Sequence, residues 1–268
     1  MERVGRLSEH VGVELSGPIA VLTLDRPAKR NALDRATVEA LGTFFAEPPE
    51  GIVAAVLTSS GEHFSAGLDL SELTDTTVFD GVRHSSGWHR PFQSIQMGTV
   101  PVVSVLRGAV IGGGLELALT THIRVAEPSA YYALPEGSRG IFVGGGASVR
   151  LPRLIGVHRM ADMMLTGRVI DADGGNDLGI SHYLVGEGAG LATAIGLARR
   201  IAGNPSATNW AVLQALPRIA DAPSADGLFV ESLVAAIVGG VDGSTTASTT
   251  PLSAGRLRRL SHREAHDD

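Results

Sequence analysis

The sequence predicts an α/β fold, because short apolar runs alternate with segments of helical periodicity over roughly the first 185 residues. Residues 19–24 are almost all apolar, as expected for a strand that is buried on both faces of a sheet. Asp34 then stands where a helix N-cap is needed, and Val38, Leu41 and Phe45 follow on one helical face. A buried strand followed by a capped amphipathic helix is the basic unit of such a fold.

The same alternation continues along the chain. Pro48 and Pro49 end the first helix, since proline cannot continue a helical hydrogen-bond ladder. A second helix is expected over 114–120, beginning at the last residue of a glycine triplet. Further strands are predicted at 52–57, 102–106, 123–126 and 131–134.

Beyond residue 186 the pattern becomes helical throughout. Helices are expected at 189–202, 207–216 and 225–238, separated by Asn-Pro and Ala-Pro pairs. From residue 239 the chain is rich in Gly, Ser and Thr, which favours a poorly ordered segment. The predicted organisation is therefore an α/β core at 1–186, a helical region at 187–238 and a flexible tail at 239–268.

Composition limits the classes of function. With 268 residues and 44% hydrophobic content, the chain can bury one large core. A net charge of −6 argues against a nucleic-acid partner, and the absence of cysteine excludes disulfides and a thiol nucleophile. We expect no membrane segment and a cytoplasmic location, because no stretch approaches the ~20 apolar residues of a membrane span and the N-terminus lacks a signal-peptide core. Lys29 is the only lysine.

Two glutamates stand beside features that expose backbone amides. Glu116 ends the segment 112–116, Gly-Gly-Gly-Leu-Glu. Its neighbours are apolar, which indicates a functional role for the carboxylate, because burying a charge is costly. Glu136 follows a proline directly after the strand predicted at 131–134. Upstream, segment 64–69 reads Phe-Ser-Ala-Gly-Leu-Asp. Amides that stabilise an anion, and two carboxylates that move protons, are what water addition to an activated double bond requires.

These segments resemble the crotonase family of enoyl-CoA hydratases and isomerases, in order and spacing from about residue 19 to 238. Segment 26–33 resembles the family's first CoA-contacting loop, and 64–69 resembles its second. Segment 112–116 matches the element that holds the first catalytic glutamate, and 135–146 resembles the element that holds the second. The two glutamates are 20 residues apart, as in the family.

The resemblance implies a spiral of repeated ββα units and a helical C-terminal region that builds homotrimers, often paired as hexamers. It implies that the N–H groups of Ala66 and Gly113 form an oxyanion hole, and Gly113 stands at a predicted helix start, where free amides favour an anion. Glu136 would give a proton to the α carbon, and Glu116 would orient and help deprotonate the water. The chain would bind no cofactor besides the coenzyme A of its thioester substrate, and no metal.

Coenzyme A would be held by a separate set of residues. Lys29 and Arg30 are the expected partners of its phosphates, the first as a mobile point charge and the second as a fork. The resemblance places main-chain groups of seven further positions along the substrate: Ala28, Ala32, Ala66, Asp69, Leu70, Gly112 and Gly144.

The predicted function is an enoyl-CoA hydratase of fatty acid and lipid metabolism. Retention of both glutamates favours hydration, because an isomerase needs only one base. The alternatives are a double-bond isomerase, thioesterase, decarboxylase or dehalogenase on the same scaffold, or a non-catalytic acyl-CoA-binding subunit. The acyl group stays open. Trp88 and His89 lie where the family varies its acyl pocket, and His89 is more ordinarily a structural histidine. The pair His262 and His266 is unassigned.

Overall fold

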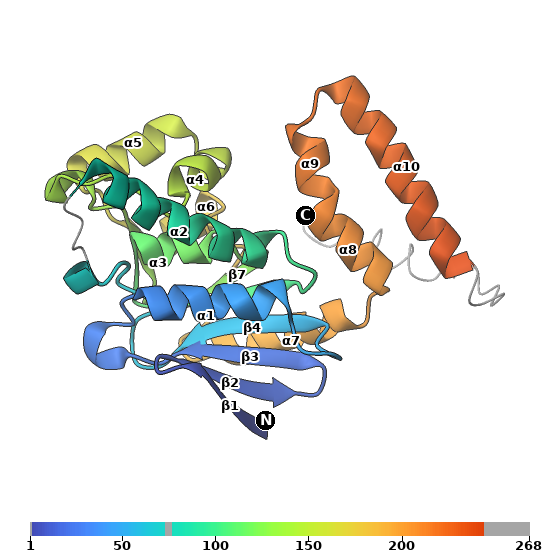
Figure 1. The fold of residues 1–268 in the computed structure, drawn as a ribbon, viewed down its shortest axis with the longest axis horizontal. Coiled ribbons are helices and arrows are strands. Elements are labelled where there is room, and N and C mark those ends of the chain that lie inside the picture. The colour runs from blue at the N-terminus through green and yellow to red at the C-terminus, as the bar shows by residue number, and fades with distance from the viewer. Residues whose placement is uncertain (1, 73–76, 244–268) are drawn as a thin grey trace, which may run out of the picture. The chain divides into compact units, whose positions relative to one another are not determined.

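The computed structural model describes residues 2–72 and 77–243 of the chain. These residues divide into two compact units, one up to Pro217 and one from Arg218 onward. Within the first unit a seven-stranded sheet has the order β1-β2-β3-β4-β5-β7-β10. Its strands β1 to β4 can be followed side by side in Figure 1. Its strands are β1 (Glu2–Ser8), β2 (Val11–Ser16), β3 (Ile19–Leu24), β4 (Ala54–Ser59), β5 (Val102–Leu106), β7 (Ile123–Ala126) and β10 (Tyr183–Leu184).

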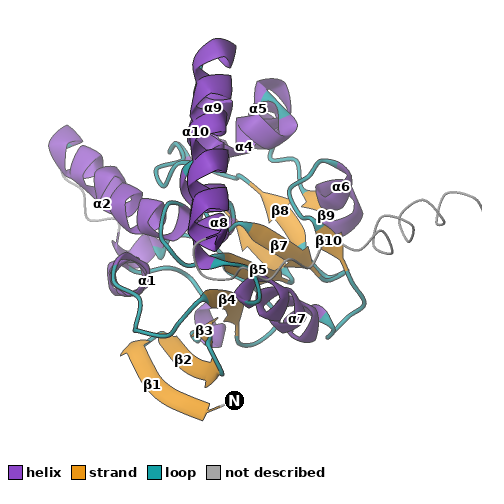
Figure 2. Ribbon diagram, turned by 90° about the vertical axis from the view of Figure 1, so that its right-hand side faces the viewer, coloured by secondary structure: helices purple, strands orange, loops and turns teal. Residues whose placement is uncertain are grey.

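The sheet changes character along its width. Strands β1, β2 and β3 pair antiparallel, whereas every later pair in the order, from β3–β4 to β7–β10, is parallel. Parallel strands must be buried on both faces, which explains their continuous apolar runs. Alternate residues serve opposite faces: Ile19 and Val21 pack toward α7 (Gly190–Ala202), whereas Ala20 and Leu22 belong to the main core on the other side (Figure 2).

A smaller sheet contains β6 (Ala109–Ile111), β8 (Tyr131–Ala133) and β9 (Ile170–Asp171) in that order. It gives the fold its repeat: a strand of the large sheet leads into a strand of the small sheet and then into a helix. β5, β6 and α3 (Gly113–Ala118) form one such unit, and β7, β8 and α4 (Ala147–Ile155) form the next. After β4, Ser65 bridges Val110 in β6 before the chain enters α2 (Val78–Gln96). The predicted ββα spiral is thereby confirmed.

Helix α1 begins where the sequence predicts, whereas α2 is a helix that the sequence analysis did not predict. The Asp34 side chain accepts a hydrogen bond from the Thr37 amide at 2.8 Å and so caps α1 (Arg35–Ala46). A capping box of Thr77 and Asp80 starts α2. The two helices pack against each other so closely that a Cβ on Gly42 would lie 2.6 Å from Pro91. This crossing fixes α2 beside the glycine-rich segments.

The remaining helices are α5 (Val157–Thr166), α6 (Ala172–Asp177), α8 (Ser206–Gln214), α9 (Leu216–Asp221) and α10 (Ser224–Gly243). The predicted helical C-terminal region is therefore present. Because α10 reaches Gly243, residues 239–243 are helical and not part of a tail. His262 and His266 lie outside the described residues. Among the described helices, none is long and apolar enough to cross a lipid bilayer.

Candidate active site

A cavity of about 280 Å³ brings the two predicted glutamates together. Glu116 reaches it from α3, and Glu136 reaches it from the turn after β8. Gly113 and Leu68 also line the cavity, next to apolar side chains such as Phe142. Two carboxylates from separate segments therefore face one space that backbone amides border.

Glu116 is held as a hydrogen-bond acceptor. Its side chain is only 3% exposed, and its Oε1 accepts hydrogen bonds from the amides of Gly145 at 2.8 Å and Ala147 at 3.0 Å. Burial raises the pKa of Glu116 above its usual value, and these amides together with the charge of Arg150 act in the opposite direction. With Oε1 occupied, Oε2 is the oxygen that can accept from a bound water.

Glu136 has a different environment. It is 7% exposed, and its Oε2 is buried without a hydrogen-bond partner among the described residues. Burial raises the pKa of Glu136, the charge of Glu116 raises it further, and Arg139 opposes the shift. A carboxyl group with an unpaired oxygen and an elevated pKa is suited to give and take a proton.

Each glycine of the triplet before Glu116 has a different structural role. Gly112 has a φ of 52°, and a Cβ there would lie 2.7 Å from Glu136 Oε1. Gly113 begins α3, so its N–H has no partner within the helix. A Cβ on Gly114 would lie 2.5 Å from the Ser65 carbonyl oxygen. The triplet therefore lets α3 approach the 64–69 segment closely.

The structure corrects one predicted oxyanion-hole residue. The N–H of Ala66 donates to the carbonyl oxygen of Arg30 at 2.9 Å, so this amide is already occupied. In the neighbouring bridge to Leu33, the carbonyl of Gly67 and the amide of Asp69 make the hydrogen bonds. This leaves the N–H of Leu68 without an acceptor in the part of the chain that the structure describes.

Leu68 also lies beside the other candidate donor. A Cβ built on Gly113 would lie 3.2 Å from the Leu68 nitrogen, so the two amides border the same space. Ala66 lines only a small neighbouring cavity of about 30 Å³, together with Leu70 and Gly112. The geometry therefore favours Leu68 and Gly113 as the oxyanion pair.

The predicted CoA-binding residues lie on two connected loops. Ala28, Lys29 and Arg30 are exposed on the turn after β3, and Ala32 is half-buried just beyond it. The Arg30 guanidinium has no partner among the described side chains. The Lys29 ammonium lies 2.9 Å from an Asp69 carboxylate oxygen but keeps about half of its surface exposed.

The Asp69 carboxylate links these two loops and borders little open space. Besides Lys29, the guanidinium of Arg26 lies 2.7 Å from the same carboxylate oxygen, a contact that sequence reasoning did not identify. Hydrogen bonds from Lys29, Ser71 and Arg26 hold the pKa of Asp69 well below its usual range. The carboxylate is thus committed to protein contacts.

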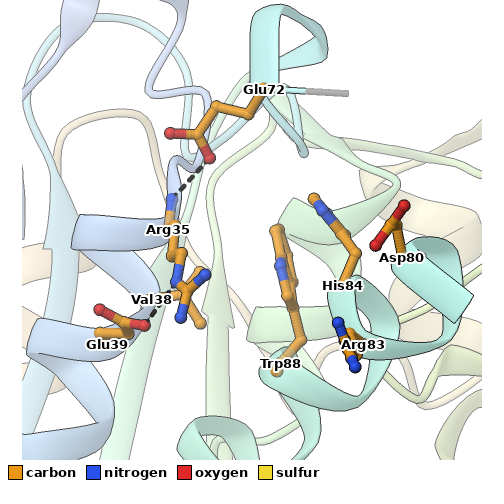
Figure 3. A pocket seen from close by; sticks show the side chains of 9 residues that line it. Arg35, Val38, Glu39, Glu72, Asp80, Arg83, His84 and Trp88 are labelled. Carbon is orange, nitrogen blue, oxygen red and sulfur yellow. Dashed lines mark hydrogen bonds and ion pairs between the residues drawn. The ribbon is translucent and has the colours of Figure 1, made fainter. Parts of the chain in front are cut away.

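Aromatic side chains of α2, among them Trp88, form one wall of the cavity. Trp88 packs edge-to-face on Phe92, with ring centroids 5.4 Å apart, and stacks with His84 at 6.3 Å. A Cβ on Gly113 would lie 2.9 Å from the Trp88 ring. Trp88 and His84 also line a second cavity of about 740 Å³ between α1 and α2 (Figure 3). The indole is therefore a partition between the two spaces.

The second cavity is lined by charges that mostly neutralise one another. The Arg35 guanidinium donates to Glu39, and Glu72 accepts a hydrogen bond from the Arg35 backbone amide (Figure 3). Gly144, which was predicted to contact substrate, lines the cavity of Glu116 and Glu136 together with Gly145. Its carbonyl oxygen accepts hydrogen bonds from α2, among them one from His89.

Comparisons with known proteins show the family of the chain. Residues 14–234 match the family model for enoyl-CoA hydratase/isomerase. The short-chain-enoyl-CoA hydratase of Clostridium acetobutylicum is 30% identical over 198 residues, covering 73% of this chain and 76% of that protein. Enoyl-CoA hydratase EchA19 of Mycobacterium tuberculosis is 32% identical over 211 residues, covering 76% of this chain and 79% of that protein.

A solved structure extends the likeness to the whole chain. A protein from Rhodopseudomonas palustris CGA009, described as a candidate enoyl-CoA hydratase, is 51% identical over 99% of both chains. The two folds superpose with a TM-score of 0.85. With the family match spanning most of the sequence, the chain belongs to the enoyl-CoA hydratase/isomerase, or crotonase, family.

Proposed function

We propose that this protein is an enoyl-CoA hydratase, which adds water across the 2,3 double bond of an enoyl-CoA thioester. The observation that carries the proposal is the convergence of Glu116 and Glu136 on one cavity in two different hydrogen-bonding states. One carboxylate is pinned by amides and the other has an unpaired oxygen. Hydration needs one group to orient water and another to deliver a proton, and the two environments fit these two roles.

The thioester oxygen would lie between the N–H groups of Leu68 and Gly113. As the oxygen of water adds to the β carbon, negative charge moves onto the thioester oxygen. Each properly aimed N–H donor then lowers the barrier by about 3 kcal/mol. Neither amide has another acceptor among the described residues, so no existing hydrogen bond must break first. The start of α3 adds a favourable dipole for the developing charge.

The proton balance follows from the two glutamates. Water donates one hydrogen bond to Glu116 Oε2, and its proton leaves toward that carboxylate as the carbon–oxygen bond forms. Glu136, whose Oε2 has no hydrogen-bond partner among the described residues, transfers a proton to the α carbon of the enolate. The enzyme returns to its starting state when the proton gained at Glu116 is lost and Glu136 is protonated again by solvent.

Coenzyme A would bind across the loops at 26–33 and 64–72. The unpaired, exposed Arg30 side chain and the half-exposed Lys29 ammonium would meet its phosphates. We also propose a homotrimer or a dimer of trimers, as in the family; light scattering on the purified full chain would test this assembly.

The test is turnover of crotonyl-CoA followed by mass spectrometry, with a gain of one water expected in the product. Glu116→Gln and Glu136→Gln should each lower kcat by about 100-fold or more and keep acyl-CoA binding, because general acid–base groups contribute on this scale. Glu50→Gln, at an exposed turn residue, is the matched control and should keep wild-type turnover. A product without added water would overturn the proposal in favour of an isomerase, thioesterase or decarboxylase. Tight binding without any turnover would indicate a non-catalytic subunit.

A further inference from the structure

One stripe of α2 contacts the loop that fixes Glu116. The Ser85 hydroxyl donates to the carbonyl oxygen of Gly144 at 2.8 Å, and His89 Nε2 lies 2.9 Å from the same oxygen. A carbonyl can only accept, so Nε2 carries a proton. One turn further along, a Cβ on Gly145 would lie 2.9 Å from the Phe92 ring. Residues 85, 89 and 92 lie on one helical face.

The stripe continues to the end of α2. Gln96 accepts a hydrogen bond from Arg150 Nε at 2.7 Å, and Arg150 Nη1 donates to the carbonyl oxygen of Gly145 at 2.9 Å. Side chains of α2 therefore hold two consecutive carbonyls of the loop. They bind the Gly144 carbonyl directly and the Gly145 carbonyl through Arg150. No other described helix makes a side-chain hydrogen bond to the Gly144 carbonyl.

The same peptide group that α2 holds also contacts Glu116. The carbonyl of Gly144 and the N–H of Gly145 are two ends of one planar peptide unit. This N–H donates to Glu116 Oε1 at 2.8 Å. Donors on the carbonyl end orient the plane and polarise the N–H, and such chains strengthen each bond by roughly 10–30%. His89 and Ser85 are thus coupled to Glu116 through a single peptide.

The loop needs such a restraint because three consecutive glycines form it. Residues 144–146 are all glycine, and Gly146 adopts a φ of 105°. Glycine populates many backbone conformations, so the peptide between Gly144 and Gly145 has little intrinsic preference for one orientation. A Cβ at Gly145 would come within 2.8 Å of Glu116 Oε2, so bulkier residues cannot stiffen the loop there.

We propose that Ser85 and His89 are positioning residues for Glu116, acting through the peptide between Gly144 and Gly145. The inference rests on the proposed hydratase function, since it assigns them to the carboxylate that orients water. Their role is to keep Glu116 Oε2 in position to accept a hydrogen bond from the water that attacks the β carbon. A displacement of about 1 Å in a reacting group can cost about 100-fold in rate.

The experiment compares steady-state hydration of crotonyl-CoA in single and double variants. Ser85→Ala and His89→Ala should each lower kcat about tenfold, and the double variant about 100-fold, with KM changed less than about twofold. His89→Gln keeps an N–H donor and should recover most of the lost kcat. Ser86→Ala is the matched control, because the Ser86 hydroxyl donates only within its own helix, to Val82.

A double-mutant cycle separates positioning from general stabilisation of the fold. If Ser85 and His89 act through Glu116, their substitution should have almost no further effect in the Glu116→Gln background. An undiminished tenfold loss in that background, or wild-type kcat in the Ser85→Ala/His89→Ala variant, would overturn the inference. Failure of the wild-type enzyme to hydrate crotonyl-CoA would overturn the proposed function itself, so the two failures are distinguishable.

Discussion

Acidification should destabilise this protein through His122, which the structure holds in its neutral form. Its Nδ1 accepts a hydrogen bond from the Val102 amide at 2.9 Å, and its Nε2 lies 3.0 Å from the Gln96 carbonyl oxygen. The ring proton is therefore on Nε2, and a second proton on Nδ1 would face the Val102 N–H. Burial lowers the pKa of His122 from 6.5 to about 4, and the charge of Arg124 contributes to the decrease.

The magnitude follows from linkage. The unfolded chain binds a proton at His122 near the ordinary pKa of 6.5, whereas the folded chain binds it only near 4. Between these values the unfolded state holds more protons, so the free energy of unfolding falls as the pH falls. The contribution is complete above pH 6.5 and fully lost below about pH 4, and it amounts to about 3 kcal/mol.

The assay is urea unfolding over this pH window in the wild type and in His122→Gln, which keeps an acceptor and a donor but does not titrate. The wild type should lose about 3 kcal/mol more than the variant on acidification. His158→Gln, at an exposed position on α5, should follow the wild type. Glu116 and Glu136 titrate in both proteins, so their contributions cancel in the difference. Parallel stability profiles for wild type and His122→Gln would refute the reasoning.

Three further predictions concern the site. Gly113→Ala should lower kcat/KM about 100-fold at an unchanged circular dichroism spectrum, because its methyl group would lie 3.2 Å from the Leu68 nitrogen, in the proposed oxyanion site. Trp88→Ala should shift preference toward longer enoyl-CoA chains by at least about tenfold in a chain-length panel. Trp210→Ala, half-exposed on α8, should keep the wild-type profile. Lys29→Met should raise KM at least about fivefold for a CoA thioester but not for a pantetheine thioester, which lacks the nucleotide phosphates.

Local features of the fold followed directly from the sequence. The strand predicted at 19–24 is β3 without adjustment, and Asp34 caps the helix that its position indicated. Hydrophobic period and capping chemistry are properties of neighbouring residues, so the sequence predicts an element where both are clear, as at these two. Helix α2, with its capping box, was missed. The two glutamates were found in the same way, because each follows a strand and a glycine or proline signal. Their spacing, which is that of the family, then predicted the chemistry.

Contacts between distant segments were decided only by the tertiary structure. Ala66 and Leu68 are equally suitable donors in the sequence, and only the position of the Arg30 carbonyl shows which amide is occupied. The ion pair of Asp69 with Arg26 and the hydrogen bond of His89 to the Gly144 carbonyl oxygen also join residues from distant segments. A hydrogen bond depends on distance and direction to within a few tenths of an ångström. That precision arises when separate loops are packed together, and no local sequence pattern records it.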